Sequence, residues 1–313
     1  MKAIILKDFG GVDQLQLVDV PVPVISASEV LIETKAISIN PIDVKTRSGK
    51  GIAPLIKDQM PAILGWDISG VVSKVGESVS QFKVGDEVFG MITFPQLGKA
   101  YAEYVAAPAD ELTLKPKNVS HNDAAPATVA ALTAWQALTL FAEIKPGDRV
   151  LIHAASGGVG HYAVQLAKHL GAYVIGTSSA ANRDFVLSLG ADEHIDYKNQ
   201  AFEEVLDRID FVLDSIGGEY IDRSLQVMNN GGTIVCIPSG LNETVVEKAA
   251  ASNKHGFTMR AKSSAEDLAM IGELLAKGTL RSHVDKVYSF KDMALAHQQI
   301  ESGRTVGKIV LTP

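Results

Sequence analysis

The first 122 residues contain short runs in which apolar and polar positions alternate, as they do in a strand with one buried face. Residues 1–6 follow this pattern, and turns with glycine separate the later runs, which cover residues 30–36, 71–76, 86–90 and 101–105. Many short strands at a spacing of roughly ten residues are typical of a rolled sheet or small barrel. The pattern therefore predicts a β domain over residues 1–122.

From residue 123 onward, apolar strands alternate with helical patterns. Helices are predicted at residues 124–140, 161–170, 183–189 and 265–277, and strands at 149–154, 173–176, 211–214, 233–237 and 308–311. Alternating strands and helices of this length predict a doubly wound parallel sheet, here over residues 123–262. The spacing leaves open which domain receives the last strand, in segment 263–313.

Composition narrows the functional class. The 313 residues carry 29 basic and 36 acidic side chains, a net charge of −7, which disfavours nucleic acid as a partner. No apolar stretch approaches the roughly 20 residues that a membrane helix needs. The single cysteine, Cys236, excludes an internal disulfide and a zinc site of several thiolates. It lies in an apolar strand, so we expect it to be buried. Because the chain has no disulfide, we expect a cytoplasmic protein.

A glycine-rich turn carries the clearest chemical signal. The strand at residues 149–154 runs into Ala155-Ser156-Gly157-Gly158-Val159-Gly160, and a helical pattern follows directly. Glycine in such a turn lets the backbone approach a pyrophosphate, which the helix N-terminus attracts. The strand before and the helix after are the context that a dinucleotide site requires. A tight turn without a ligand is the alternative.

The end of the next strand indicates which dinucleotide is bound. NAD-binding folds usually place a carboxylate there for the ribose hydroxyls. This chain instead has Ser178, Ser179 and Arg183, and its first carboxylate is Asp184. Hydroxyl groups and a guanidinium suit a 2′-phosphate, so the predicted cofactor is NADP(H). Arg183 as an ordinary surface cation is the alternative.

Taken together, several motifs resemble the medium-chain dehydrogenase/reductase superfamily, in its zinc-independent quinone oxidoreductase (zeta-crystallin-like) branch. They are the glycine turn and residues 36–43, 61–72, 84–90, 131–135 and 214–218. The resemblance implies an α/β fold with a GroES-like β-barrel catalytic domain (1–122), a Rossmann NADP-binding domain (123–262) and a C-terminal segment (263–313) returning to the first domain. It also implies a homodimer or homotetramer.

Departures from the zinc-dependent relatives predict that no metal is bound. Those relatives carry a catalytic cysteine where this chain has Ser38, and a His-Glu pair where it has Trp66-Asp67. Residues 94–102 lack the cysteines of a structural zinc lobe. Without a Lewis acid to polarise an alcohol, the expected reaction is hydride transfer from the nicotinamide to a quinone or similar conjugated carbonyl.

The resemblance also implies site residues in the first domain. Asn40 and Asp43 are expected beside the nicotinamide as catalytic residues, with the Asn40 amide donating to the carbonyl oxygen. Trp66 and Tyr101 are expected to line the substrate pocket. The plainer alternatives are a structural turn at Asn40-Pro41, a local helix cap at Asp43 and a simple core position for Trp66.

For the cofactor, the same resemblance implies contacts along the second domain and the helix before it. The implied residues are Thr128, Ser156, Gly157, Gly158, Val159, Gly160, Thr177, Ser178, Ser179, Arg183, Tyr197, Ser215, Pro238, Ser239 and Gly240. Near the C-terminus, Arg304 and Lys308 are expected on a solvated face, and contact with the cofactor or substrate is the alternative.

Alternative functions remain open. An enone reductase needs the same hydride geometry, and free small enones are as suitable as quinones. The 2-enoyl-thioester branch carries a tyrosine that residues 47–51 lack, although Lys45, Arg47 and Lys50 are candidates to meet an acidic substrate tail. Outside enzymes, relatives serve as lens crystallins and RNA-binding proteins. The preferred prediction is an NADPH:quinone oxidoreductase with a small-molecule quinone or enone partner, and no nucleic-acid or membrane partner.

Overall fold

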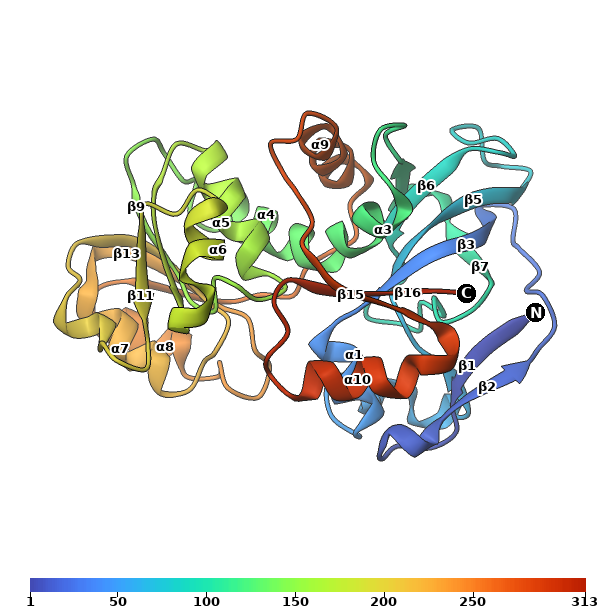
Figure 1. Ribbon diagram of the computed structural model, residues 1–313, viewed down its shortest axis with the longest axis horizontal. Coiled ribbons are helices and arrows are strands. Elements are labelled where there is room, and N and C mark those ends of the chain that lie inside the picture. The colour runs from blue at the N-terminus through green and yellow to red at the C-terminus, as the bar shows by residue number, and fades with distance from the viewer. The chain divides into compact units, whose positions relative to one another are not determined.

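The computed structural model describes all 313 residues, and the chain forms two compact units (Figure 1). The β unit comprises Met1–Leu132 and Lys262–Pro313, and the α/β unit comprises Thr133–Ala261. Both kinds of architecture expected from the hydrophobic pattern are confirmed. No helix is both long and apolar enough to cross a bilayer.

The β unit is built on a mostly antiparallel sheet, in which only β15 and β16 pair in parallel, and its long central strand is β3 (Glu29–Ile39). β3 pairs with β5 (Asp67–Val75), β7 (Tyr104–Pro108) and β16 (Lys308–Thr312). The sheet also contains β6 (Glu87–Met91), β8 (Leu112–Leu114) and β15 (Val284–Ser289). A smaller sheet contains β1 (Lys2–Leu6), β2 (Leu15–Asp19) and β4 (Ala62–Ile63). The helices are α1 (Pro41–Arg47), α2 (Ala53–Ile56), α3 (His121–Ala124), α9 (Ala265–Ala276) and α10 (Met293–Glu301).

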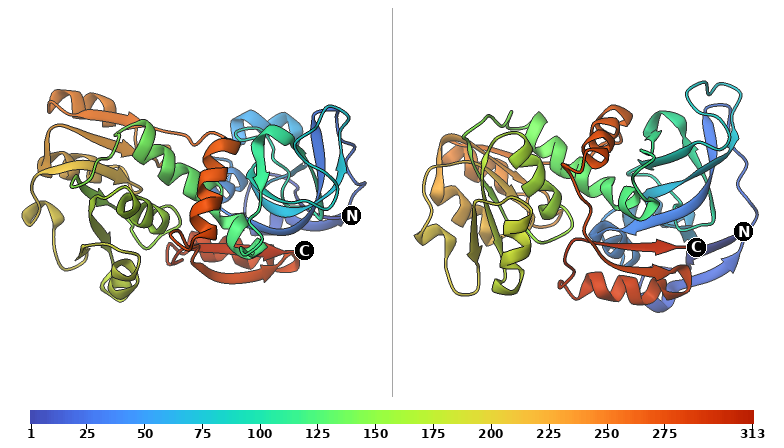
Figure 2. Two further views of the ribbon diagram at one scale, coloured as in Figure 1. Left: turned by 90° about the horizontal axis from the view of Figure 1, so that it is seen from above. Right: turned by 45° about the horizontal axis from the view of Figure 1, so that its top comes forward.

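The last strand settles a question that spacing left open. β16 runs antiparallel to β3, with Val310 opposite Ser38 and Ile309 opposite Ile39. The views in Figure 2 show the C-terminal strands beside the strands of the first hundred residues. The end of the chain therefore completes the sheet of the β unit.

The helix predicted over residues 124–140 is interrupted. α3 ends at Ala124, a 3-10 turn covers Ala125–Ala127, and α4 runs over Val129–Leu140. Pro126 has no amide hydrogen for a helical bond, and Thr128 leaves helical geometry with φ −109° and ψ −96°. The boundary between the units follows Leu132, whereas the sequence placed it after residue 122. The start of α4 belongs to the β unit, where the Val129 amide donates to Asp67 Oδ1 at 3.0 Å.

The α/β unit contains a six-stranded sheet in the order β11-β10-β9-β12-β13-β14, with all neighbours parallel. Its strands are β9 (Arg149–Ile152), β10 (Tyr173–Ser178), β11 (Glu193–Asp196), β12 (Ile209–Asp214), β13 (Met228–Cys236) and β14 (His255–Thr258). Its helices are α5 (Gly160–His169), α6 (Arg183–Ser188), α7 (Glu219–Val227) and α8 (Val245–Ala251), besides most of α4. This strand order is that of the Rossmann fold.

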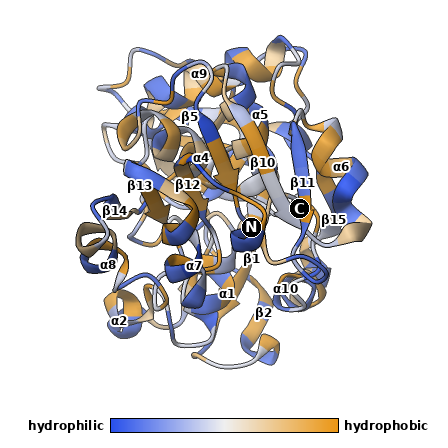
Figure 3. Cartoon of the chain, turned by 90° about the vertical axis from the view of Figure 1, so that its left-hand side faces the viewer, coloured by the Kyte–Doolittle hydropathy of each residue, from blue (hydrophilic) through white to orange (hydrophobic).

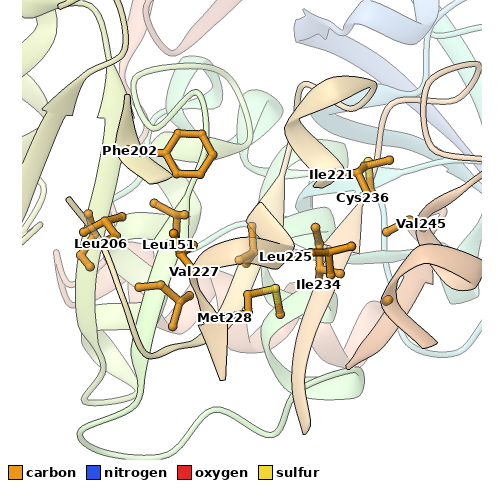
Figure 4. Packing of buried hydrophobic residues seen from close by; sticks show 14 of the residues in the cluster. Leu151, Phe202, Leu206, Ile221, Leu225, Val227, Met228, Ile234, Cys236 and Val245 are labelled. Atoms are coloured by element: carbon orange, nitrogen blue, oxygen red, sulfur yellow. The ribbon is translucent and has the colours of Figure 1, made fainter. Parts of the chain in front are cut away.

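Apolar side chains fill the space between this sheet and its helices. Leu151, Phe202, Ile221 and Ile234 belong to one buried cluster (Figure 4). Cys236 lies in the same cluster with no exposed surface, so its predicted burial is confirmed. Hydrophobic colouring follows the inner strands in Figure 3, whereas the edge strand β11 is hydrophilic. Because the strands are parallel, this packing places the carboxyl ends of β9, β10 and β12 side by side at the same end of the sheet.

Candidate functional site

Asn40 stands where a strand changes into a helix. β3 ends at Ile39, Asn40 keeps an extended backbone (φ −124°, ψ 157°), and Pro41 begins α1. Asparagine is a favoured N-cap residue and proline a favoured first residue of a helix. The Asn40 amide N–H donates to Asp43 Oδ2 at 2.8 Å. The structural turn and local cap considered for these residues are therefore present, and they position both side chains.

The side-chain amide of Asn40 is held by an ion pair. Lys308 Nζ donates to Asn40 Oδ1 at 2.5 Å, and Asn40 Nδ2 donates to Asp67 Oδ2 at 2.8 Å. Lys308 Nζ also lies 3.3 Å from Asp67 Oδ2. The three contacts determine which end of the amide is oxygen, so one Nδ2 hydrogen remains for another acceptor.

The prediction that Lys308 lies on a solvated face is wrong. Its side chain is only 3% exposed, because β16 pairs inside the sheet and directs this residue toward Asp67. Arg304, in the loop before β16, is exposed as expected. A charged residue in an apolar strand, Lys308-Ile309-Val310-Leu311, was the available sign, since a buried cation needs a partner.

A second buried hydrogen-bond network meets the Asn40 network at Asp43, which accepts from the Asn40 amide. Tyr101 OH donates to Asp43 Oδ1 at 2.8 Å and lies 3.2 Å from His297 Nε2, from α10. Burial raises the pKa of Asp43 to about 7, and the Asp67 charge acts in the same direction. Burial lowers the pKa of His297 to about 3, so its ring is neutral near pH 7. The sequence reasoning missed His297, because nothing local marks a helix residue that meets the chain near position 101.

Trp66 and Tyr101 both lie inside the β unit with no exposed surface. Trp66 Nε1 donates to Gln96 O at 2.6 Å, and its ring packs edge-on against Phe94 at 5.5 Å between centroids. The core position weighed as an alternative for Trp66 is therefore observed. Contact of either ring with a substrate stays a prediction.

Two other predictions in this unit concern charge and metal ligands. Arg47 was a candidate for an acidic substrate tail, but its side chain is 3% exposed and pairs with Glu301 on α10. Ser38 Oγ donates to Ile309 O at 3.0 Å. Nowhere in the chain do three His, Cys, Asp or Glu side chains form a group that could hold a metal ion.

In the α/β unit, the glycine turn between β9 and α5 is sterically tight. A Cβ atom on Gly160 would lie 2.2 Å from Ala154 O, and one on Gly176 would lie 2.8 Å from Ala155 Cβ. Ala154 itself has a positive φ of 51°. Glycine is thus required for the helix to approach the strands this closely. The turn leaves Gly157, Gly158 and Val159 before the N-terminus of α5, where an anion is favoured, so the residues fit a pyrophosphate.

The end of β10 carries polar groups and no carboxylate. Ser178 Oγ lies 2.8 Å from His194 Nε2 of β11, and Asn182 Nδ2 donates to Ser156 Oγ at 3.0 Å. The Arg183 side chain is 62% exposed and only 3.7 Å from Asp184, a loose pair. These residues, with the half-buried Ser179 and the exposed Tyr197, fit a phosphate on the ribose. His194 was missed, since parallel pairing alone brings β11 beside β10. Asn182 was also missed, although it directly precedes Arg183.

Thr128 and Thr177 are placed differently from the other cofactor candidates. Thr177 is buried, and its Oγ1 lies 3.1 Å from His153 Nδ1. Burial lowers the pKa of His153 to about 4. Thr128 belongs to the β unit, where its Oγ1 donates to Ala125 O at 2.8 Å. Both hydroxyl groups are engaged inside their own units.

The remaining candidates lie on two loops that are joined to each other. Asp214 Oδ1 accepts from the Ile216 and Gly217 amides, and the Gly218 amide donates to Leu241 O at 2.8 Å. The first loop carries Ser215, whose buried Oγ has no partner within the protein. The second loop carries the remaining cofactor candidates, Pro238, Ser239 and Gly240. An unsatisfied buried hydroxyl is suited to a bound ligand.

Comparison with known proteins gives this geometry a family. The model of the alcohol dehydrogenase GroES-like domain matches residues 26–117, and that of the zinc-binding dehydrogenase matches residues 189–311. The NADPH-dependent alkenal/one oxidoreductase of Arabidopsis thaliana is 34% identical over the whole of this chain and 80% of its own length.

Two solved structures extend the likeness to the whole fold. The quinone oxidoreductase from Coxiella burnetii has a TM-score of 0.96 and 38% identity, covering 100% of this chain and 99% of its own. The Escherichia coli quinone oxidoreductase complexed with NADPH has a TM-score of 0.88 and 31% identity, with complete coverage of both chains. The chain belongs to the medium-chain dehydrogenase/reductase superfamily, in its zinc-independent quinone oxidoreductase branch.

Proposed function

We propose that this chain is an NADPH-dependent reductase that transfers hydride to a quinone or a similar conjugated carbonyl. The substrate gains two electrons with the hydride, NADPH becomes NADP⁺, and a proton from water completes the hydroquinone or the saturated ketone. The α/β unit binds the cofactor in this proposal, and Asn40 in the β unit binds the carbonyl.

The cofactor assignment is carried by the polar groups and the cation at the carboxyl end of β10. Ser178, Asn182 and Arg183 surround it, and the first carboxylate, Asp184, points into solvent with its side chain 97% exposed. A dianionic 2′-phosphate gains hydrogen bonds and a cation there and meets no buried negative charge. Relatives named as NADPH-dependent, or solved with NADPH, support the same choice.

The carbonyl assignment follows from the orientation of Asn40. Its oxygen faces the Lys308 ammonium, so its remaining Nδ2 hydrogen is the group offered to an acceptor. Reduced nicotinamide supplies the hydride when it is bound. A donor held in advance stabilises the negative charge that then develops on the carbonyl oxygen. Both quinones and enones spread this charge by conjugation.

The test is anaerobic oxidation of NADPH and of NADH with para-benzoquinone and, in parallel, with a short alkenone and with a 2-enoyl thioester, each corrected for the uncatalysed reaction. We expect turnover with para-benzoquinone, with the alkenone or with both, and a clear preference for NADPH. Turnover with a 2-enoyl thioester alone would overturn the substrate class, and the burial of Arg47 speaks against that outcome. Failure of all acceptors despite NADPH binding would overturn the reductase assignment and favour a crystallin-like role.

Assembly and location complete the proposal. β14 is an edge strand of the six-stranded sheet, paired only with β13, so its outer backbone groups are available to another strand. We assign this edge to a second copy of the chain, which gives a homodimer. A cytoplasmic location stays a prediction.

A further inference from the structure

His194 lies at the predicted 2′-phosphate site, although nothing in the glycine motif or the β10 sequence points to it. Parallel pairing places Gly176 opposite His194 and Ser178 opposite Asp196. The His194 ring reaches the end of β10, where its Nε2 lies 2.8 Å from Ser178 Oγ. His194 is half-buried, and it contacts a residue assigned to the phosphate.

Whether Nε2 of this imidazole carries a proton determines whether the Ser178 hydroxyl can donate a hydrogen bond to a phosphate. A serine hydroxyl has one hydrogen to donate. If His194 Nε2 is unprotonated, Ser178 donates to it and has no hydrogen left for a phosphate. If Nε2 carries a proton, as it does in the protonated ring and in one of the two neutral tautomers, Ser178 accepts from His194 and keeps its own hydrogen to donate. In this structure the acceptor within reach of that hydrogen is Ser179 O, 3.2 Å away. Only the second arrangement lets Ser178 turn its hydrogen to a phosphate oxygen.

Few charged side chains lie near His194, and they shift its pKa in opposite directions. β10 contributes no charged side chain, α6 contributes Arg183 and Asp184, and β11 itself contributes Glu193 and Asp196. Burial lowers the pKa of His194, Arg183 lowers it further, and Asp196 acts in the opposite direction. The ring is therefore mainly neutral near pH 7 without a ligand. A phosphate dianion beside it would favour the protonated ring.

We propose that His194 is a specificity-determining residue for the 2′-phosphate of NADP(H), becoming protonated as the cofactor binds and holding Ser178 as a donor. This inference rests on the proposed cofactor function. It means that the preference for NADPH over NADH increases as pH falls through the neutral range. The 2′-phosphate itself becomes protonated with a pKa near 6, which lowers the preference for NADPH as pH falls. The experiment therefore compares the wild type with variants, in which this contribution is the same.

The experiment measures the Kd of NADPH and of NADH at pH 8 and pH 6.5 for the wild type, His194→Gln and His194→Val. His169→Gln is the matched control, because His169 is an exposed histidine in the last turn of α5. Calorimetry of NADPH binding in two buffers of different ionisation enthalpy gives the proton uptake. The phosphate titrates equally in every protein, so differences between variants report His194.

We expect the NADH-to-NADPH ratio of Kd values to rise toward pH 6.5 about three- to tenfold more in the wild type than in His194→Gln, since each pKa unit gained on binding is worth about tenfold. The glutamine amide still donates to Ser178 but does not titrate, so His194→Gln retains NADPH preference with a flatter pH profile. His194→Val weakens NADPH alone, and His169→Gln behaves as the wild type.

An identical pH profile and proton uptake in the wild type and His194→Gln would overturn the role of His194. That result differs from failure of the cofactor assignment, which would appear as equal NADPH and NADH affinities in the wild type at both pH values.

Discussion

At Asn40, two charged side chains from distant parts of the chain orient one amide group. Asp67 comes from the start of β5 and Lys308 from the start of β16, and both are almost fully buried. A buried ion pair contributes little net stability, because desolvation of the charges offsets their attraction. Its value here is orientation, since the ammonium holds the amide oxygen and leaves the nitrogen as donor.

Lys308→Met tests this positioning role. It leaves the Asp67 charge buried without a cation, so we expect the free energy of unfolding to fall by about 3–5 kcal/mol. Lys308→Met combined with Asp67→Asn removes both charges and should recover most of that loss. The double variant should still show kcat reduced about tenfold to a hundredfold with the Kd of NADPH unchanged. Wild-type kcat in the double variant would show that the ion pair serves the fold alone.

Among the elements, the turn from β9 to α5 shows how close packing excludes side chains. Gly160 has no room for a Cβ beside Ala154 O. Gly272, inside α9 of the β unit, is different, because a Cβ there would meet Phe89 at an ordinary 3.5 Å. The same substitution should therefore have opposite effects in the two helices.

Gly160→Ala should lower the free energy of unfolding by about 1–3 kcal/mol through overpacking and should weaken NADPH binding. Gly272→Ala should raise it by about 0.5–1 kcal/mol, because alanine favours the helix and gains a buried contact. Denaturant unfolding followed by circular dichroism, with NADPH titrations, measures both. Equal stability of the two variants would contradict the steric explanation.

At the scale of the whole molecule, the six-stranded sheet has two edges that differ in character. β11 is short and largely polar, with the sequence Glu193-His194-Ile195-Asp196. β14 has the sequence His255-Gly256-Phe257-Thr258 and no acidic residue. An uncharged edge lacks the usual protection against pairing with another strand. This contrast favours β14 as the contact in a homodimer.

We expect sedimentation equilibrium to give twice the 33.3 kDa mass of the chain at micromolar concentration. Amide hydrogen exchange in residues 255–258 should slow as protein concentration rises, because pairing covers those amides. Exchange in residues 193–196 should not depend on concentration, which provides the internal control. A monomer throughout, or protection of both edges alike, would argue against this interface.

Local pattern predicted much of the fold of this molecule. The alternating runs became β3, β5, β6 and β7, and the glycine turn lies between β9 and α5 as its composition required. Glycine in the turn and serine after β10 are local signals, because backbone clearance and hydrogen-bonding groups belong to the residues themselves. The break at Pro126 and Thr128 was missed, since an alanine-rich run hides the effect of one proline.

The sequence by itself thus determined the two kinds of sheet, the turn that suits a pyrophosphate and the polar groups that replace an acidic ribose ligand. Only the tertiary structure decided the partners of those groups. Lys308 meets Asn40 across 268 positions of sequence, and His297 meets Tyr101 across 196. The β10–β11 pairing likewise brings His194 to Ser178. The physical reason is that hydrophobic burial and strand pairing position the backbone, and long-range polar contacts follow from that placement.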